Sequence, residues 1–244
     1  MPDEAIDWVE IPAGTLLRGT PADELPDIAE RFSDTGVPLA WYVKEVPRTP
    51  IRVPAFRIAR TPVTVGQWEP FAAETGRSLP DGPADHPVFG VSWDAAVAFC
   101  AWTARRTGME VRLPTEDEWE RAARGDDARE FPWGDEYRRG LANLVDLGLG
   151  TTTPVGSFPG GASPFGVLDM AGNVDEWTST LYAPYPGAPP ELAATESWAF
   201  DPHITRGGAF RHDRDLARCA RRHGAYEEDL RAIGVGVRLA ASAA

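Results

Sequence analysis

The chain is organised around one stretch, Pro164-Phe165-Gly166-Val167-Leu168-Asp169-Met170-Ala171-Gly172-Asn173-Val174-Asp175-Glu176-Trp177. It is too apolar to be a solvated linker, yet Gly166 and Gly172 give its backbone a freedom that side-chained residues resist. The carboxylates of Asp169 and Glu176 bracket the turn at Gly172. Hard carboxylate oxygens and the carbonyls of an irregular turn suit a calcium ion. The residues alone favour a simpler interpretation, a buried turn whose carboxylates accept hydrogen bonds from backbone amides.

The composition predicts a substantial core and long loops. Hydrophobic residues make up 43% of the 244 residues, and 24 glycines and 23 prolines are scattered through the chain without a repeat. The net charge of -13 argues against a nucleic-acid partner, because binding to phosphates requires clustered Lys and Arg. An acidic surface of this kind fits a soluble protein or one that attracts cations.

The two cysteines, Cys100 and Cys219, are too few for a disulfide framework. The first residues, Met1 to Asp7, are acidic and lack the apolar segment of a signal peptide. No apolar run approaches the length of a membrane span. We therefore expect a cytoplasmic protein with no membrane partner.

Capping signals predict three helices. Thr64 and Thr115 are each followed three residues later by Gln or Glu, the pattern of a capping box, and Ser92 precedes a third apolar-periodic segment. A shorter helix is expected over residues 25–32. Short strands are expected at residues 8–11, 15–17, 51–53, 56–58, 151–158, 204–210 and 234–239. With no repeat and no clear linker, residues 1–244 are predicted to form a single α+β domain.

Several motifs occur in a fixed order along the chain. They are Arg112-Leu113-Pro114-Thr115-Glu116-Asp117-Glu118-Trp119-Glu120, Phe131-Pro132-Trp133-Gly134-Asp135-Glu136, Thr153-Pro154-Val155-Gly156, Asp169-Met170-Ala171-Gly172-Asn173-Val174-Asp175-Glu176-Trp177, Arg206-Gly207-Gly208 and Gly236-Val237-Arg238-Leu239. Over nearly its whole length the chain resembles the formylglycine-generating enzyme (sulfatase-modifying factor) domains. The resemblance implies one compact domain, a variant of the C-type-lectin-like fold with little regular secondary structure.

The resemblance also implies structural calcium ions. One would be held by the side chains of Asp169 and Glu176 and by the carbonyls of Gly172 and Val174. A second would use the side chain of Asn143 and the carbonyl of Leu144, although the loop that follows is shorter here than in the family. Asp146 could supply a further oxygen.

The chain departs from the family where formylglycine generation takes place. That reaction uses a pair of copper-binding cysteines shortly after the Arg-Gly-Gly motif, because thiolates suit Cu(I). Here the only cysteine of that segment is Cys219, which resembles a non-catalytic family position, and Ala209 replaces a hydroxyl residue. Cys100 lies on a predicted helix and is expected in the core. Formylglycine generation is therefore not expected.

The segment after Arg-Gly-Gly contains other candidate ligands. His212, Asp215 and His223 are the candidate catalytic residues. The histidine pair together with one carboxylate of this segment (Asp213, Asp215, Glu227 or Glu228) could bind iron or copper. The alternative is a solvated run of charges that neutralise one another. His86 and His203 are expected to be structural. The predicted substrate groove comprises Trp198, Arg206, Arg211, Cys219, Arg221 and Tyr226.

Two functions of different classes remain, besides a formylglycine-generating enzyme with relocated thiols at Cys100 and Cys219. The first is an oxidative enzyme acting on a small molecule or peptide; related sulfoxide synthases take their iron-binding histidines from an extra helical domain, for which this chain has no room. The second is a non-catalytic module that binds a ligand or peptide on the same scaffold. A fold alone does not separate them, because function resides in the site.

Overall fold

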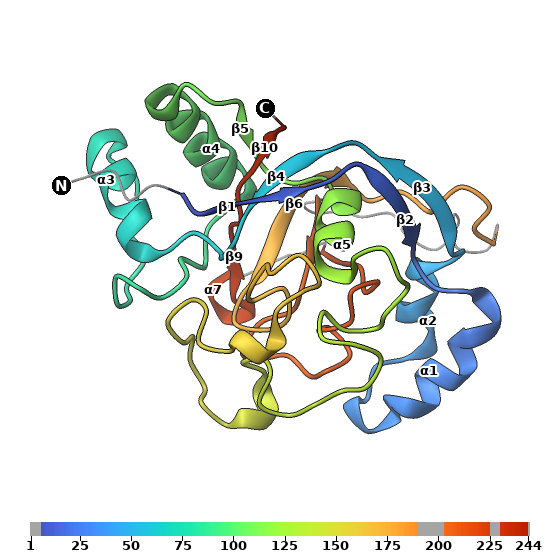
Figure 1. Ribbon diagram of the computed structural model, residues 1–244. Helices are drawn as coiled ribbons and strands as arrows, with labels where there is room; N and C mark the ends of the chain where they lie inside the picture. The colour runs from blue at the N-terminus through green and yellow to red at the C-terminus, as the bar shows by residue number, and fades with distance from the viewer. Residues whose placement is uncertain (1–5, 190–202, 225–229, 244) are drawn as a thin grey trace.

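The computed structural model describes residues 6–189, 203–224 and 230–243 (Figure 1). Its helices are α1 (Leu25–Arg31), α2 (Leu39–Tyr42), α3 (Val65–Thr75), α4 (Trp93–Thr107), α5 (Glu116–Arg124) and α7 (Leu230–Ile233). Its strands are β1 (Trp8–Ile11), β2 (Gly14–Arg18), β3 (Thr49–Val53), β4 (Phe56–Ala59), β5 (Val111–Arg112), β6 (Asp175–Leu181), β7 (His203–Arg206), β8 (His223–Gly224), β9 (Val235–Gly236) and β10 (Ala240–Ser242).

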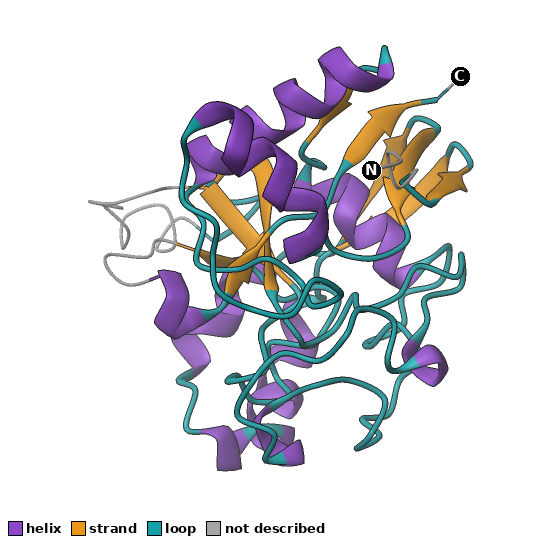
Figure 2. Cartoon of the chain, turned by 90° about the vertical axis from the view of Figure 1, so that its left-hand side faces the viewer, coloured by secondary structure: helices purple, strands orange, loops and turns teal. Residues whose placement is uncertain are grey.

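The strands form two four-stranded sheets and one two-stranded ribbon. The first sheet has the order β1-β4-β10-β5, so the first and last strands of the chain both pair with β4 (Figure 1). The second has the order β8-β7-β6-β9, in which β6 and β9 are parallel. The ribbon pairs β2 with β3. This arrangement is α+β, as predicted, and loops dominate the lower half of the molecule in Figure 2.

The capping predictions for the three main helices are confirmed. The hydroxyls of Thr64 and Thr115 accept hydrogen bonds from the backbone N–H three residues later, and both capping boxes are complete. The hydroxyl of Ser92 accepts from the Ala95 N–H at the start of α4. Capping is a local interaction, which explains why the sequence alone located these helix starts.

The strand expected over residues 151–158 is not formed. Pro154 has no N–H to donate to a ladder, and Gly156 has φ +76°, which is outside the strand region. The segment is held by single contacts instead. Val155 N donates to Asp85 O at 2.9 Å, and Gly156 N donates to the Asp169 carboxylate at 2.7 Å.

Aromatic side chains form much of the core between α3 and α4. Trp68 stacks on Phe99 with ring centroids 4.8 Å apart, and Phe71 meets Phe99 edge to face at 5.4 Å. A second cluster packs Trp119 of α5 against Phe56 and Ile58 of β4. Among the residues that the structure describes, no helix has the length and apolar character needed to cross a bilayer.

Candidate functional site

Three strands of the second sheet bring one carboxylate and one imidazole together. Asp175 is the first residue of β6, and Thr205 of β7 pairs directly with His223 of β8. The Asp175 Oδ2 atom accepts a hydrogen bond from Thr205 Oγ1 at 2.7 Å and lies 3.0 Å from His223 Nδ1. A carboxylate at this distance orients the imidazole with its Nδ1–H toward Asp175.

The second oxygen of Asp175 binds the loop that follows β7. Its Oδ1 accepts from the Gly208 N–H at 3.2 Å. Gly208 has φ +71°, and an added Cβ would lie 3.0 Å from the Leu216 side chain, so this close turn favours glycine. Asp175 is fully buried, and its hydrogen bonds offset the cost of removing a carboxylate from water.

His212 lies in the same loop and is held by a tight turn. Its backbone N–H donates to Ala209 O at 2.8 Å, and its ring Nδ1 accepts from the Ala209 N–H at 2.9 Å. Burial lowers the pKa of His212 to about 4, against an opposing attraction from Asp175. The imidazole is therefore uncharged near neutral pH.

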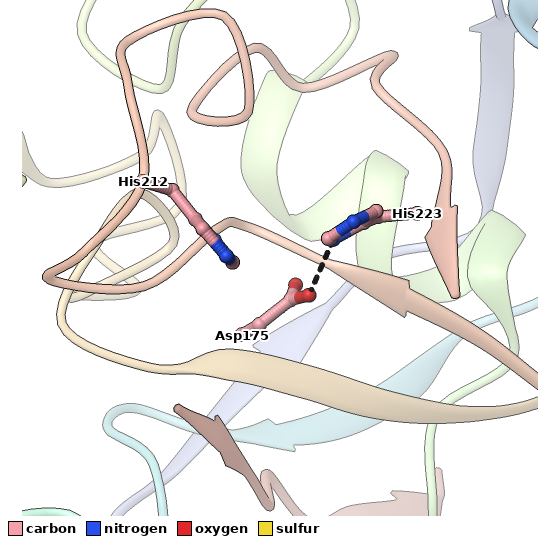
Figure 3. A group of neighbouring side chains, drawn as sticks. All are labelled: Asp175, His212 and His223. Carbon is pink, nitrogen blue, oxygen red and sulfur yellow. Dashed lines mark hydrogen bonds and ion pairs between the residues drawn. The ribbon is translucent and has the colours of Figure 1, made fainter. Parts of the chain in front are cut away.

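The three side chains form one cluster, and all point toward the same space (Figure 3). One potential ligand atom from each of Asp175, His212 and His223 lies within 4.8 Å of the others. The two imidazoles meet edge to face, with ring centroids 5.4 Å apart. Two imidazoles and a carboxylate are a donor set for iron, copper or zinc, so this is a candidate metal site whose ion the geometry does not select.

The two histidines proposed from the sequence are brought together, but the proposed carboxylate is not among them. Asp215 is buried in an ion pair with Arg221 at 3.4 Å, and Asp175 takes its place beside the imidazoles. Alternation along a strand was the available signal. Neighbouring side chains of a strand point to opposite faces, so Asp175 and Glu176 cannot share one. Because Glu176 was assigned to the face of Gly172 and Val174, Asp175 had to lie on the opposite face.

Three predicted groove residues lie in the interior instead. The Arg206 guanidinium donates to Glu116 and Glu120 of α5, and the Arg221 guanidinium contacts Asp215. Cys219 is fully buried. A buried arginine needs a carboxylate partner, and α5 supplies two such carboxylates to Arg206.

The other predicted groove residues have different outcomes. Arg211 is exposed, with its guanidinium 5.0 Å from the centre of the Phe210 ring. Trp198 and Tyr226 lie outside the described residues. The histidines expected to be structural have other contacts: His86 Nδ1 lies 2.9 Å from the Thr152 hydroxyl, and His203 stacks on Trp93.

The Glu176 carboxylate, which was assigned to a calcium ion, lies beside an arginine. Both carboxylate oxygens of Glu176 accept hydrogen bonds from Arg238, at 2.6 and 2.8 Å, and Oε2 also accepts from Trp119 Nε1 at 2.6 Å. The same guanidinium donates to the carbonyls of Leu168 and Asp169. Arg238 therefore supplies a positive charge directly beside Glu176, and a role of this carboxylate as a calcium ligand stays a prediction.

The remaining residues of the two expected calcium sites differ in how they fit an ion. The Asp169 carboxylate accepts from the Gly156 N–H, and the backbone at Gly172 packs directly on Asn143, while Val174 is buried. Asn143 Oδ1 is a buried acceptor without a hydrogen-bond partner. A buried oxygen without a hydrogen-bond partner is costly unless a cation or water binds it. The second calcium site, at Asn143 and the Leu144 carbonyl, stays a prediction, and the unpartnered Asn143 Oδ1 supports it.

Comparison with known proteins agrees with the fold and the motifs. The family model described as "Sulfatase-modifying factor enzyme 1-like domain" matches residues 2–243. The chain belongs to this family. Like its relatives with solved structures, this sulfatase-modifying-factor-like domain keeps the α+β arrangement: it superimposes on PvdO from Pseudomonas aeruginosa with a TM-score of 0.73 and 26% identity, over 97% of this chain and 94% of that one.

The family includes enzymes of different activities. This domain is 34% identical over 244 residues to a hercynine oxygenase from Mycolicibacterium thermoresistibile, covering 80% of this chain and 53% of the relative. It is 44% identical over 115 residues to a formylglycine-generating enzyme from Mycobacterium tuberculosis, covering 42% of this chain and 36% of the relative. The chain thus spans about half the length or less of these curated relatives.

Proposed function

We propose that this protein is an oxidative enzyme that acts on a small molecule or peptide, with Asp175, His212 and His223 as its reaction centre. The observation that carries the proposal is the pair of buried Asp175 and half-buried His223 facing a second imidazole. Polar groups of this kind are costly to bury without a function or a structural need.

The family relationship supports the class of reaction. The relatives named above include an oxygenase and an enzyme that generates formylglycine. Both cysteines of this chain are buried, so thiol chemistry at an open site is not the basis of the proposal. A transition-metal ion such as iron or copper is a second element of the proposal, supported by the pairing of His223 Nδ1 with the Asp175 carboxylate, which is the usual arrangement of a metal-binding histidine.

The test is oxygen uptake by the purified protein with panels of small molecules and peptides. We expect His212→Ala and His223→Ala to abolish turnover, because each removes one of the two imidazoles. His86→Ala is the matched control, since His86 binds Thr152 and is not part of the cluster. Full turnover in either site variant, or equal loss in the control, would contradict the proposal.

Metal analysis of the native protein separates this function from a non-catalytic binding module. Iron or copper at about one ion per chain, lost in the His223→Ala variant, supports the oxidative enzyme. A protein that binds a peptide ligand equally well with and without both imidazoles, and that shows no oxygen uptake, supports the binding module.

A further inference from the structure

The position of the proton on His212 follows from one hydrogen bond. A backbone amide can only donate, so the Ala209 N–H at 2.9 Å requires a lone pair on His212 Nδ1. An imidazole that accepts a hydrogen bond at Nδ1 is not the doubly protonated cation, so the ring is neutral. A neutral imidazole with a lone pair on Nδ1 carries its single proton on Nε2. His212 therefore has its N–H at Nε2.

This proton position conflicts with metal binding through His212. An ion at Nδ1 would have to replace the hydrogen bond from the Ala209 N–H. An ion at Nε2 would require the proton to move to Nδ1, and the Nδ1–H would then face the Ala209 N–H, so that two donors would meet. Metal-binding histidines ordinarily donate from their second nitrogen. His223 has that arrangement, with Nδ1 facing Asp175, whereas His212 has the reverse. The two imidazoles are chemically unlike.

We infer that His212 is a hydrogen-bond donor and not a metal ligand, and that its Nε2–H binds a neutral carbonyl oxygen of the substrate. This inference rests on the proposed function, which places the reaction centre at this cluster. A carbonyl oxygen accepts an N–H hydrogen bond at about 2.9 Å. A carboxylate is disfavoured because an oxygen of Asp175 lies within 4.8 Å of a His212 nitrogen, and like charges repel. An alkylammonium group is disfavoured because it has no acceptor to offer.

The proton position is measured directly by long-range proton–nitrogen NMR spectra of protein labelled with ¹⁵N-histidine. The chain has only 4 histidines, so the signals are separable with single substitutions. We expect His212 to show the Nε2–H form at neutral pH and to keep it after addition of one equivalent of Zn²⁺. We expect N-methylacetamide, a neutral carbonyl probe, to shift the His212 signals, and acetate and methylammonium to leave them in place.

His212→Phe serves as the site variant, and His86→Ala as the control that keeps the response to N-methylacetamide. An Nδ1–H form at His212, or a stoichiometric change of its signals on Zn²⁺ addition, would overturn the donor assignment. Absence of a response to N-methylacetamide, or an equal response to acetate, would overturn the carbonyl assignment. Failure of the proposed function has a different signature: the expected tautomer together with no oxygen uptake.

Discussion

Asp175 and Glu176 are adjacent carboxylates with opposite surroundings. Both are fully buried, but Asp175 binds Thr205 and His223, while Glu176 binds Arg238. Neighbouring side chains of a strand point to opposite faces, so one face of β6 contributes to the histidine cluster and the other to the interior. A single step along the chain separates a functional candidate from a structural ion pair.

The two thiols are predicted to be unreactive in the folded protein. Cys100 and Cys219 are buried, and burial raises the pKa of each thiol to about 12, so almost no thiolate forms near pH 8. We expect no alkylation by iodoacetamide at pH 8 in the native state and complete alkylation after denaturation, as measured by mass spectrometry. Rapid native labelling of Cys219 would reopen a role for thiol chemistry.

Asn143 is the residue at which a calcium ion is expected to act. A calcium ion would bind its unpartnered Oδ1. Because an ion that binds only the folded state stabilises that state, calcium should raise the stability of the protein. We expect Ca²⁺ to raise the Tm of the native protein and Mg²⁺ to raise it less, as measured by calorimetry. In Asn143→Ala the Ca²⁺-dependent rise should disappear; a rise of the same size in that variant would place the ion elsewhere.

At the scale of elements, α5 connects β7 of the second sheet to the segment that follows the Arg206-Gly207-Gly208 motif. Glu116 accepts from Arg222 and Arg206, and Glu120 accepts from Arg206 and Arg124. The helix begins at a complete capping box, so its start determines where these carboxylates lie. The residues before His223 are therefore positioned by a helix far away in the sequence.

Removal of the α5 cap is predicted to destabilise the fold. The Thr115 hydroxyl accepts from the Glu118 N–H, and loss of such a cap costs about 1 kcal/mol. We expect Thr115→Ala to lower the free energy of unfolding by that amount in urea titrations. Thr115→Ser keeps a hydroxyl and should retain most of the stability. If both variants were equally destabilised, the methyl group and not the cap would be the cause.

For the molecule as a whole, Arg238 joins segments that are far apart in the sequence. Its guanidinium donates to carbonyls at Ala59 and Arg60, to the carbonyls of Leu168 and Asp169, and to Glu176. These groups belong to the end of β4 and the residue after it, to the stretch before β6, and to β6 itself. One buried cation thus connects the first sheet, the loops and the second sheet.

Truncation of Arg238 should therefore weaken the entire fold. Arg238→Met leaves the Glu176 carboxylate buried without its partner, which costs about 3–5 kcal/mol. Urea unfolding should show that loss, and the double variant Arg238→Met with Glu176→Gln should recover part of it because the unpaired charge is removed. A strictly additive double variant would mean that the two side chains do not interact as the structure indicates.

The sequence by itself determined the family, the α+β class and the starts of α3, α4 and α5, because motifs and caps depend on residues close together in the chain. It also selected His212 and His223. Only the tertiary structure decided that Asp175, and not Asp215, joins them, and that Arg238 neutralises Glu176. Asp175 and His223 are 48 residues apart, and Glu176 and Arg238 are 62 apart. Several carboxylates and arginines are available for such pairs, and the packing of strands and α5 selects among them because a buried charge requires a partner at hydrogen-bond distance.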